Sequence, residues 1–294
     1  MRIISQKTII DVIKQRYSVR AYQSVPLTDK DRNLVEECLV QKTTNPFDGE
    51  LRFKLINILQ TDSTKKIKLN TYGFIRGARH YIVAIAKPSE NILKHTGYAM
   101  ENVILDTTRL NLGTCWIAGT FNRKQVAKHV DLNQNSNEFI PAISPVGYIT
   151  EKQNLRASTI RFLAKAKKRK KWEELFFIDD YHSPLSESMA ENYQQPLQML
   201  RLAPSASNKQ PWRIITNDKL SAFHFFISTN IQKTPILNSL IPFRLEYLDI
   251  GIAVNHFDLT CKKLNLQGSW LEKTPSMSIH PNWEYVISWF ENGK

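Results

Sequence analysis

The feature that most constrains the fold of this chain is a long internal repeat. Residues 97–116 align without gaps to residues 251–270. The aligned positions share residue types, among them Gly97 with Gly251, Leu110 with Leu264 and Trp116 with Trp270. Apolar positions within both segments recur at intervals of three and four residues, which predicts two long helices in the core. A repeat of this length indicates two similar halves in one chain.

The repeat extends to the segments that precede these two helices. In each half a Pro-Leu pair, beginning at Pro26 and again at Pro184, leads into a polar cap and a helical pattern. A loop and an apolar strand follow, and the strands begin near Arg52 and Trp212. We therefore predict an α+β fold in which antiparallel-rich sheets are wrapped by long core helices, with two similar halves forming one intertwined unit. The expected parts are a first half over residues 1–159, a basic connecting helix over residues 160–175 and a second half over residues 176–294.

A stiff polar loop occupies residues 201–212, which read RLAPSASNKQPW. Its two prolines, Pro204 and Pro211, restrict the backbone and stop the preceding helix. Ser205, Asn208 and Gln210 supply hydroxyl and amide groups that both donate and accept hydrogen bonds. A rigid, mixed edge of this kind suits a planar heterocycle with alternating carbonyls and ring nitrogens. A polar helix-to-strand loop without a ligand fits the same composition.

A second polar motif lies near the N-terminus, where residues 16–22 read RYSVRAY. Arg16, Ser18 and Arg20 alternate, so an extended segment places all three on one face. Two guanidinium groups and a hydroxyl suit a phosphate, because the arginine fork matches phosphate oxygens in geometry. Two solvated arginines are the alternative interpretation of this motif taken alone.

These two motifs, together with LNLGTCWIAG over residues 110–119, resemble three segments of the FMN-dependent nitroreductase family. The chain is most similar to a group of that family in which one chain forms a pseudo-dimer. The resemblance implies that one FMN is held by side chains and backbone groups from three places. The phosphate would be held by Arg16, Ser18 and Arg20, together with Lys167 or Arg169. The ring edge would be held by Pro204, Ser205, Asn208 and Gln210. The backbone of Ala118 and Gly119 would lie near flavin N5 and O4.

Each motif occurs in one half only, which predicts one flavin site per chain. In the first half, Pro46, Gly49 and Leu51 align with Ser205, Asn208 and Gln210. In the second half, Glu174, Phe176 and Ile178 align with Arg16, Ser18 and Arg20. The family builds its site from the two complementary elements of a two-fold dimer. One complementary site is therefore expected to survive here, and the other is expected to be lost.

The resemblance implies an oxidoreductase that transfers a hydride from NADH or NADPH to FMN and then passes electrons to a quinone-like or nitroaromatic acceptor. We assign no catalytic residue, and Cys115 is interpreted as a small packed residue. The expected partner is a small-molecule acceptor, and the chain is expected to be monomeric. An FMN-binding protein without turnover, which stores or senses flavin, is the alternative function.

The net charge of +13 at pH 7 raises the question of a nucleic-acid or membrane partner. Much of the excess lies in residues 165–171, which we interpret as part of the solvated connecting helix, so neither partner is expected. The three cysteines are far apart and the seven histidines have no ligand spacing, so neither disulfide bonds nor a metal are predicted. No apolar run approaches ~20 residues and no signal peptide is evident, which together predict a cytoplasmic protein.

Overall fold

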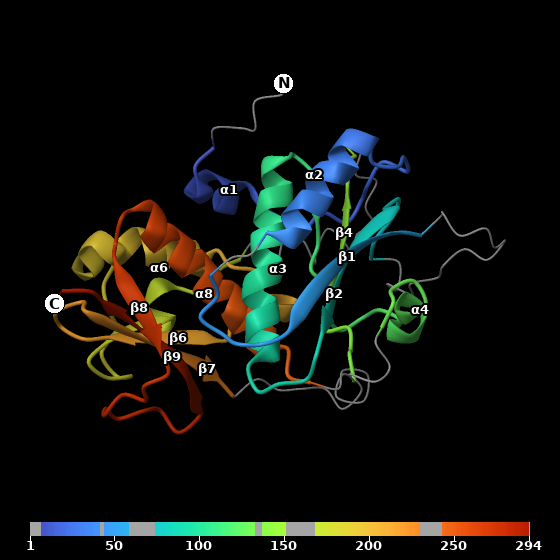
Figure 1. The fold of residues 1–294 in the computed structure, drawn as a ribbon. Helices are drawn as coiled ribbons and strands as arrows, with labels where there is room; N and C mark the ends of the chain where they lie inside the picture. The colour runs from blue at the N-terminus through green and yellow to red at the C-terminus, as the bar shows by residue number, and fades with distance from the viewer. Residues whose placement is uncertain are drawn as a thin grey trace.

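The computed structural model describes residues 7–41, 44–58, 74–132, 137–150, 168–229 and 243–293. Its helices are α1 (Ile9–Gln15), α2 (Asp29–Val40), α3 (Ile92–Arg109), α4 (Arg123–Ala127), α6 (Gln194–Arg201) and α8 (Glu246–Lys263). Two sheets lie on opposite sides of the central pair α3 and α8 (Figure 1). Within the described ranges, none of the helices has the length and apolarity needed to cross a bilayer.

The two sheets share one order of four strands, and the second sheet has one additional edge strand. The first sheet runs β1-β2-β4-β3, with β1 (Leu51–Asn57), β2 (His80–Ala86), β3 (Gly113–Thr114) and β4 (Ile143–Gly147). The second runs β5-β6-β7-β9-β8, with β5 (Phe176–Ile178), β6 (Trp212–Thr216), β7 (Ala222–Ser228), β8 (Gly268–Leu271) and β9 (Trp283–Glu291). All neighbouring strands pair antiparallel except β5 and β6, which pair parallel. The predicted α+β class with two similar halves is confirmed.

The repeated Leu-Asn-Leu sequence ends both central helices in the same way. Asn111 and Asn265 adopt left-handed backbone conformations, with φ of 59° and 58°. Asparagine tolerates this conformation better than most residues, which makes it a helix stop. The N–H of Leu112 then donates to the carbonyl of Thr107 at 3.1 Å, and the equivalent bond in the second half is 3.0 Å long. Each chain segment therefore turns at the same point toward its short strand, β3 or β8.

The helices α3 and α8 cross at two glycines that the repeat alignment pairs with each other. A Cβ atom added to Gly97 would lie 2.1 Å from the carbonyl oxygen of Leu248. A Cβ atom added to Gly251 would lie 2.1 Å from the carbonyl oxygen of Lys94. Each carbonyl belongs to the residue three positions before the opposite glycine, so the contact is reciprocal. Only a residue without a side chain allows two helix backbones to approach so closely.

The connecting helix expected over residues 160–175 does not continue through its described part. Residues 168–171 are not helical, and Trp172–Glu174 forms a single 3-10 turn, while residues 160–167 lie outside the described ranges. The physical reason is a set of side-chain hydrogen bonds from the polar loop. Gln210 accepts from the backbone N–H of Lys170 at 2.8 Å, and Asn208 donates to the carbonyl of Lys168 at 2.6 Å. These bonds occupy backbone groups that a helix would have used internally.

Replacing either crossing glycine with alanine is expected to destabilise the protein. Helix propensity alone would make Gly97→Ala or Gly251→Ala stabilising by about 1 kcal/mol. The clash with a backbone carbonyl should instead lower the free energy of unfolding by at least about 2 kcal/mol, because two helices must separate. Urea denaturation measures the difference. Gly147→Ala is the matched control, since its Cβ would meet only a side-chain atom of Tyr22 at 3.4 Å. A stabilised Gly97→Ala variant would contradict the role of the crossing.

Candidate functional site

The first half delivers Arg16 to the seam between the two halves. Arg16 follows α1, whose apolar face packs in one cluster with Leu105 of α3 and Met199 of α6. The helix begins with a capping box at Thr8 and ends at Gln15, so the chain leaves it in an extended conformation at Arg16. The Arg16 side chain is only 6% exposed. Its position is therefore set by packing against both halves.

A buried carboxylate, Glu101 of α3, meets Arg16 at this seam. Arg16 Nε lies 3.5 Å from Glu101 Oε1, and His256 Nε2 of α8 lies 3.0 Å from the same oxygen. The indole N–H of Trp116 donates to Glu101 Oε2 at 2.6 Å. His256 Nδ1 lies 2.9 Å from the carbonyl oxygen of Met199, which can only accept, so Nδ1 carries a proton. The Glu101 carboxylate thus contacts Arg16 of the N-terminal motif, Trp116 of the first half and His256 of the second half.

Glu101 and His256 are not among the site residues predicted from the sequence. A signal for both was present in the repeat, because Glu101 aligns with Asn255, and His256 aligns with Asn102. Polar residues that differ between halves, on helices that are otherwise apolar, mark positions where the two halves have different chemistry. All four of these side chains are buried in the structure.

The rest of the N-terminal motif surrounds Cys115. Ser18 forms a parallel bridge with Thr114, and the N–H of Val19 donates to the Thr114 carbonyl at 2.8 Å. Burial raises the pKa of the Cys115 thiol, while Arg20, a hydrogen bond with Ser18 and Arg16 act in the opposite direction. The structure therefore brings Arg16, Ser18 and Arg20 together. A buried thiol with a raised pKa is a poor nucleophile.

The second half contributes two further guanidinium groups. Arg169 donates to Asn208 Oδ1 and to the Leu202 carbonyl, both at 3.0 Å. Burial, followed by the nearby charges of Arg16 and Arg201, lowers the pKa of Arg169 to about 10. Arginines from both halves are therefore close enough to repel one another. Lys167, the other predicted phosphate ligand, lies outside the described residues.

This arginine cluster fits a phosphate. Within the described part of the chain, Arg16 Nε is buried and has no hydrogen-bond acceptor. Glu101 lies 3.5 Å from Arg16 Nε without accepting a hydrogen bond from it, and one carboxylate does not balance the charges of Arg16, Arg169 and Arg201, so a further anion would be favourable. A phosphate dianion would supply acceptor oxygens and negative charge together.

The polar loop has a strained backbone. Ser207, Asn208 and Gln210 have positive φ values of 53°, 56° and 49°, although none is glycine. Such conformations cost energy and concentrate at ligand-binding sites. The loop is held on one side by the Ala206 N–H, which donates to the buried Asp249 of α8 at 2.9 Å. Burial raises the pKa of Asp249 well above its usual value.

The amide groups of the loop have a role that the sequence analysis did not assign. Gln210 is 3% exposed, and besides the Lys170 bond its amide donates to the carbonyl of Lys168 at 3.3 Å. Its own backbone N–H donates to Ser205 Oγ at 2.9 Å. Pro204 and Ser205, at the start of the loop, are half-buried. Asn208 and Gln210 therefore fix residues 168–170, and with them Arg169, beside the loop.

The third predicted element, Ala118 and Gly119, lies in a half-buried bend that is fixed at both ends. We call residues 116–119 the ring loop. Ile117 exchanges backbone hydrogen bonds of 2.9 Å with Ile143, and the guanidinium of Arg123 donates to the carbonyl of Ala118. The Trp116 bond to Glu101 anchors the start of the ring loop next to the Arg16 pair.

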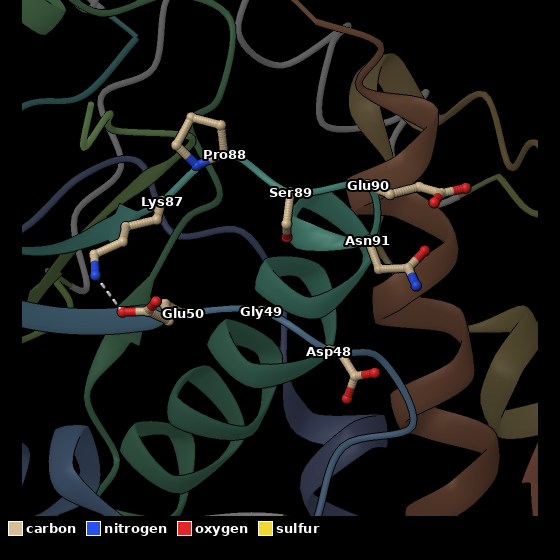
Figure 2. A pocket seen from close by; sticks show the side chains of 8 residues that line it. All are labelled: Asp48, Gly49, Glu50, Lys87, Pro88, Ser89, Glu90 and Asn91. Carbon is tan, nitrogen blue, oxygen red and sulfur yellow. Dashed lines mark ion pairs between the residues drawn. The ribbon is translucent and has the colours of Figure 1, made fainter. Parts of the chain in front are cut away.

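The first-half counterpart of the polar loop lies beside a cavity of different character. This cavity of about 500 Å³ is lined by Asp48, Gly49, Glu50, Lys87, Pro88, Ser89, Glu90 and Asn91 (Figure 2). Lys87 pairs with Glu50 at 2.5 Å, which leaves an acidic lining. None of the predicted flavin ligands lines it. An acidic lining disfavours a phosphate.

The fold and the arrangement of these elements define a nitroreductase-like protein. The family described as "Putative TM nitroreductase" matches residues 8–261, and the chain belongs to this family. A "putative nitroreductase" from Thermotoga maritima shares the fold, with a TM-score of 0.59 and 18% identity over 97% of this chain and 94% of that chain. A nitroreductase with bound FMN from Bacteroides fragilis aligns over 52% of this chain and 97% of its own, with 20% identity and a TM-score of 0.38. No curated protein matches significantly.

Removing the buried carboxylate is expected to weaken the seam. Glu101→Ala leaves Arg16 without its counter-charge and His256 Nε2 without its hydrogen-bond partner, and it should lower the free energy of unfolding by about 3–5 kcal/mol. Glu101→Gln also removes the charge but keeps an oxygen for the Trp116 indole and an NH₂ group for His256, so a smaller loss than that of Glu101→Ala is expected. Urea denaturation distinguishes the two variants. Glu36→Ala on the exposed face of α2 is the control, and an equally small effect of Glu101→Ala would contradict the inferred network.

Proposed function

We propose that this protein is an FMN-dependent oxidoreductase, a single-chain pseudo-dimer with one cofactor site between its halves. The observation that supports this most strongly is that the charges of Arg16, from the first half, and Arg201, from the second, both act on the buried Arg169. Like charges are brought together there, and a buried donor has no acceptor among the described residues. A phosphate group accounts for both features.

The residues on either side of this cluster suit the rest of the cofactor. Arg16, Ser18, Arg20 and Arg169 would hold the phosphate, with Lys167 as a further candidate. The strained loop from Pro204 through Ser205 to Gln210 would present polar groups to the ring edge, and the backbone of Ala118 and Gly119 would lie near its reactive position. Asn208 and Gln210 would act chiefly by holding Arg169, since their amides already bond residues 168–170.

When bound, FMN would supply hydride chemistry, accepting from NADH or NADPH and reducing a quinone-like or nitroaromatic small molecule. The chain's own contribution is binding and positioning. Its buried arginines would neutralise the phosphate, and its ring loop is fixed by hydrogen bonds at both ends. We assign no general acid or base.

The function is tested by titration and anaerobic reduction. Fluorescence quenching should show about one FMN bound per chain. Each half retains only one of the two complementary motifs, so only one complete site can form. NADH or NADPH should then bleach the flavin absorbance under anaerobic conditions. Binding without bleaching by either nucleotide would favour flavin storage or sensing. No FMN uptake would contradict the proposal.

The phosphate contact has its own test. Arg16→Ala should weaken FMN binding about ten- to hundredfold, because a charge-assisted contact is worth about 1.5–3 kcal/mol. Riboflavin lacks the phosphate, so its affinity should change little. Isothermal titration of both ligands gives the ratio, with Arg32→Ala as the control because Arg32 pairs with Asp29 on the surface. Equal losses for FMN and riboflavin would show that Arg16 is structural.

A further inference from the structure

A second arginine beside the ring loop is held in an unusual way. Arg123 is the first residue of α4, and its guanidinium is bound along one side by backbone carbonyls. Its Nε donates to the Ile140 carbonyl at 3.1 Å, and its Nη2 donates to the carbonyls of Ala118 and, at 3.5 Å, Pro141. These bonds connect the ring loop to the segment that leads into β4.

Aromatic rings enclose the guanidinium as well. The Arg123 Cζ atom lies 4.4 Å from the ring centroid of Phe121 and 5.3 Å from that of Phe243. Phe243 belongs to the second half, and Phe139 packs edge-on against it with centroids 6.1 Å apart. The guanidinium therefore cannot rotate freely, and its surroundings are aromatic.

In the described part of the chain, the charge of Arg123 is offset only by backbone carbonyl dipoles and aromatic faces. Among the described residues no carboxylate forms an ion pair with it, and burial alone lowers its pKa to about 10. Taking a cation out of water is costly when no anion accompanies it. The positive charge therefore calls for an anionic partner outside the described chain.

One nitrogen remains to receive such a partner. Nη1 makes no hydrogen bond to any residue that the structure describes, and it is not among the buried, unsatisfied atoms. It thus keeps its two N–H donors in a fixed direction, accessible from outside, beside Ala118. A preorganised donor loses little conformational entropy when it binds.

The geometry points to Arg123 as the group that binds an anionic oxygen of an aromatic electron acceptor at the ring loop, an inference that rests on the proposed function. The guanidinium supplies a charge-assisted hydrogen bond, and a carboxylate is the anion that its fork best matches. The neighbouring phenylalanine rings favour a planar aromatic body over a strongly hydrated one. The substrate class is therefore an aromatic acceptor that carries a carboxylate.

The test uses benzoate, a redox-inert probe, and FMN-loaded protein in isothermal titration. Arg123→Gln should weaken benzoate binding at least about tenfold, as expected for losing a charge-assisted bond. Arg123→Lys retains the charge without the fork and should lose less. Lys124→Gln removes one charge from the adjacent exposed residue and should leave the affinity unchanged. Equal benzoate affinity in wild type and Arg123→Gln would overturn the inference.

A second test compares two ligands on the wild-type protein, so it does not depend on whether a variant folds. Benzamide has the shape of benzoate without its charge, so benzoate should bind at least about tenfold more tightly. Equal affinities, or no binding of either compound, would overturn the inference. The proposed function fails separately, if the wild type does not take up FMN. Uptake of FMN with no preference for benzoate contradicts only the role of Arg123.

Discussion

The close approach of α3 to α8 is the constraint on which the rest of the structure depends. Gly97 and Gly251 each face a backbone carbonyl of the opposite helix. Because the helices pack this closely, polar groups along the seam are buried and must satisfy one another. The side-chain amide of Asn255 donates to the Tyr98 carbonyl at 3.1 Å, and the Tyr98 hydroxyl donates to Asp258 at 2.5 Å. Each half therefore completes hydrogen bonds that the other half needs.

The two halves keep one fold but differ in chemistry at equivalent places. Trp116 donates its indole N–H to Glu101 at 2.6 Å, and the aligned Trp270 donates to Asp258 at 2.8 Å. Glu101 faces the Arg16 guanidinium and a histidine, whereas Asp258 accepts from a tyrosine hydroxyl and pairs with Lys262 at 2.6 Å. The equivalent tryptophans thus bind carboxylates that stand at non-equivalent positions of the two helices and have different partners. A duplicated fold needs to conserve only its packing, which leaves the polar groups free to diverge.

Several features near the proposed site are unfavourable in isolation. The polar loop contains three non-glycine residues with positive φ, Arg169 lies near other arginines, and Arg123 has no carboxylate partner among the described residues. Contacts with more rigid elements hold these groups in place, as the hydrogen bond from the Ala206 N–H to Asp249 on α8 does for the polar loop. Local conflicts of this kind concentrate where a ligand is expected to complete the interactions.

The sequence by itself determined the repeat, the long helices, the α+β class with two similar halves and the resemblance to a nitroreductase family. These follow from local periodicity, from the alignment of the chain with itself and from short motifs that depend on neighbouring residues. Only the tertiary structure decided which distant side chains meet. The grouping of Glu101 with His256, the use of Gln210 to hold residues 168–170 and the isolation of the Arg123 charge all depend on how helices and loops pack across the seam. Such contacts join residues far apart in the chain, and no local pattern specifies them.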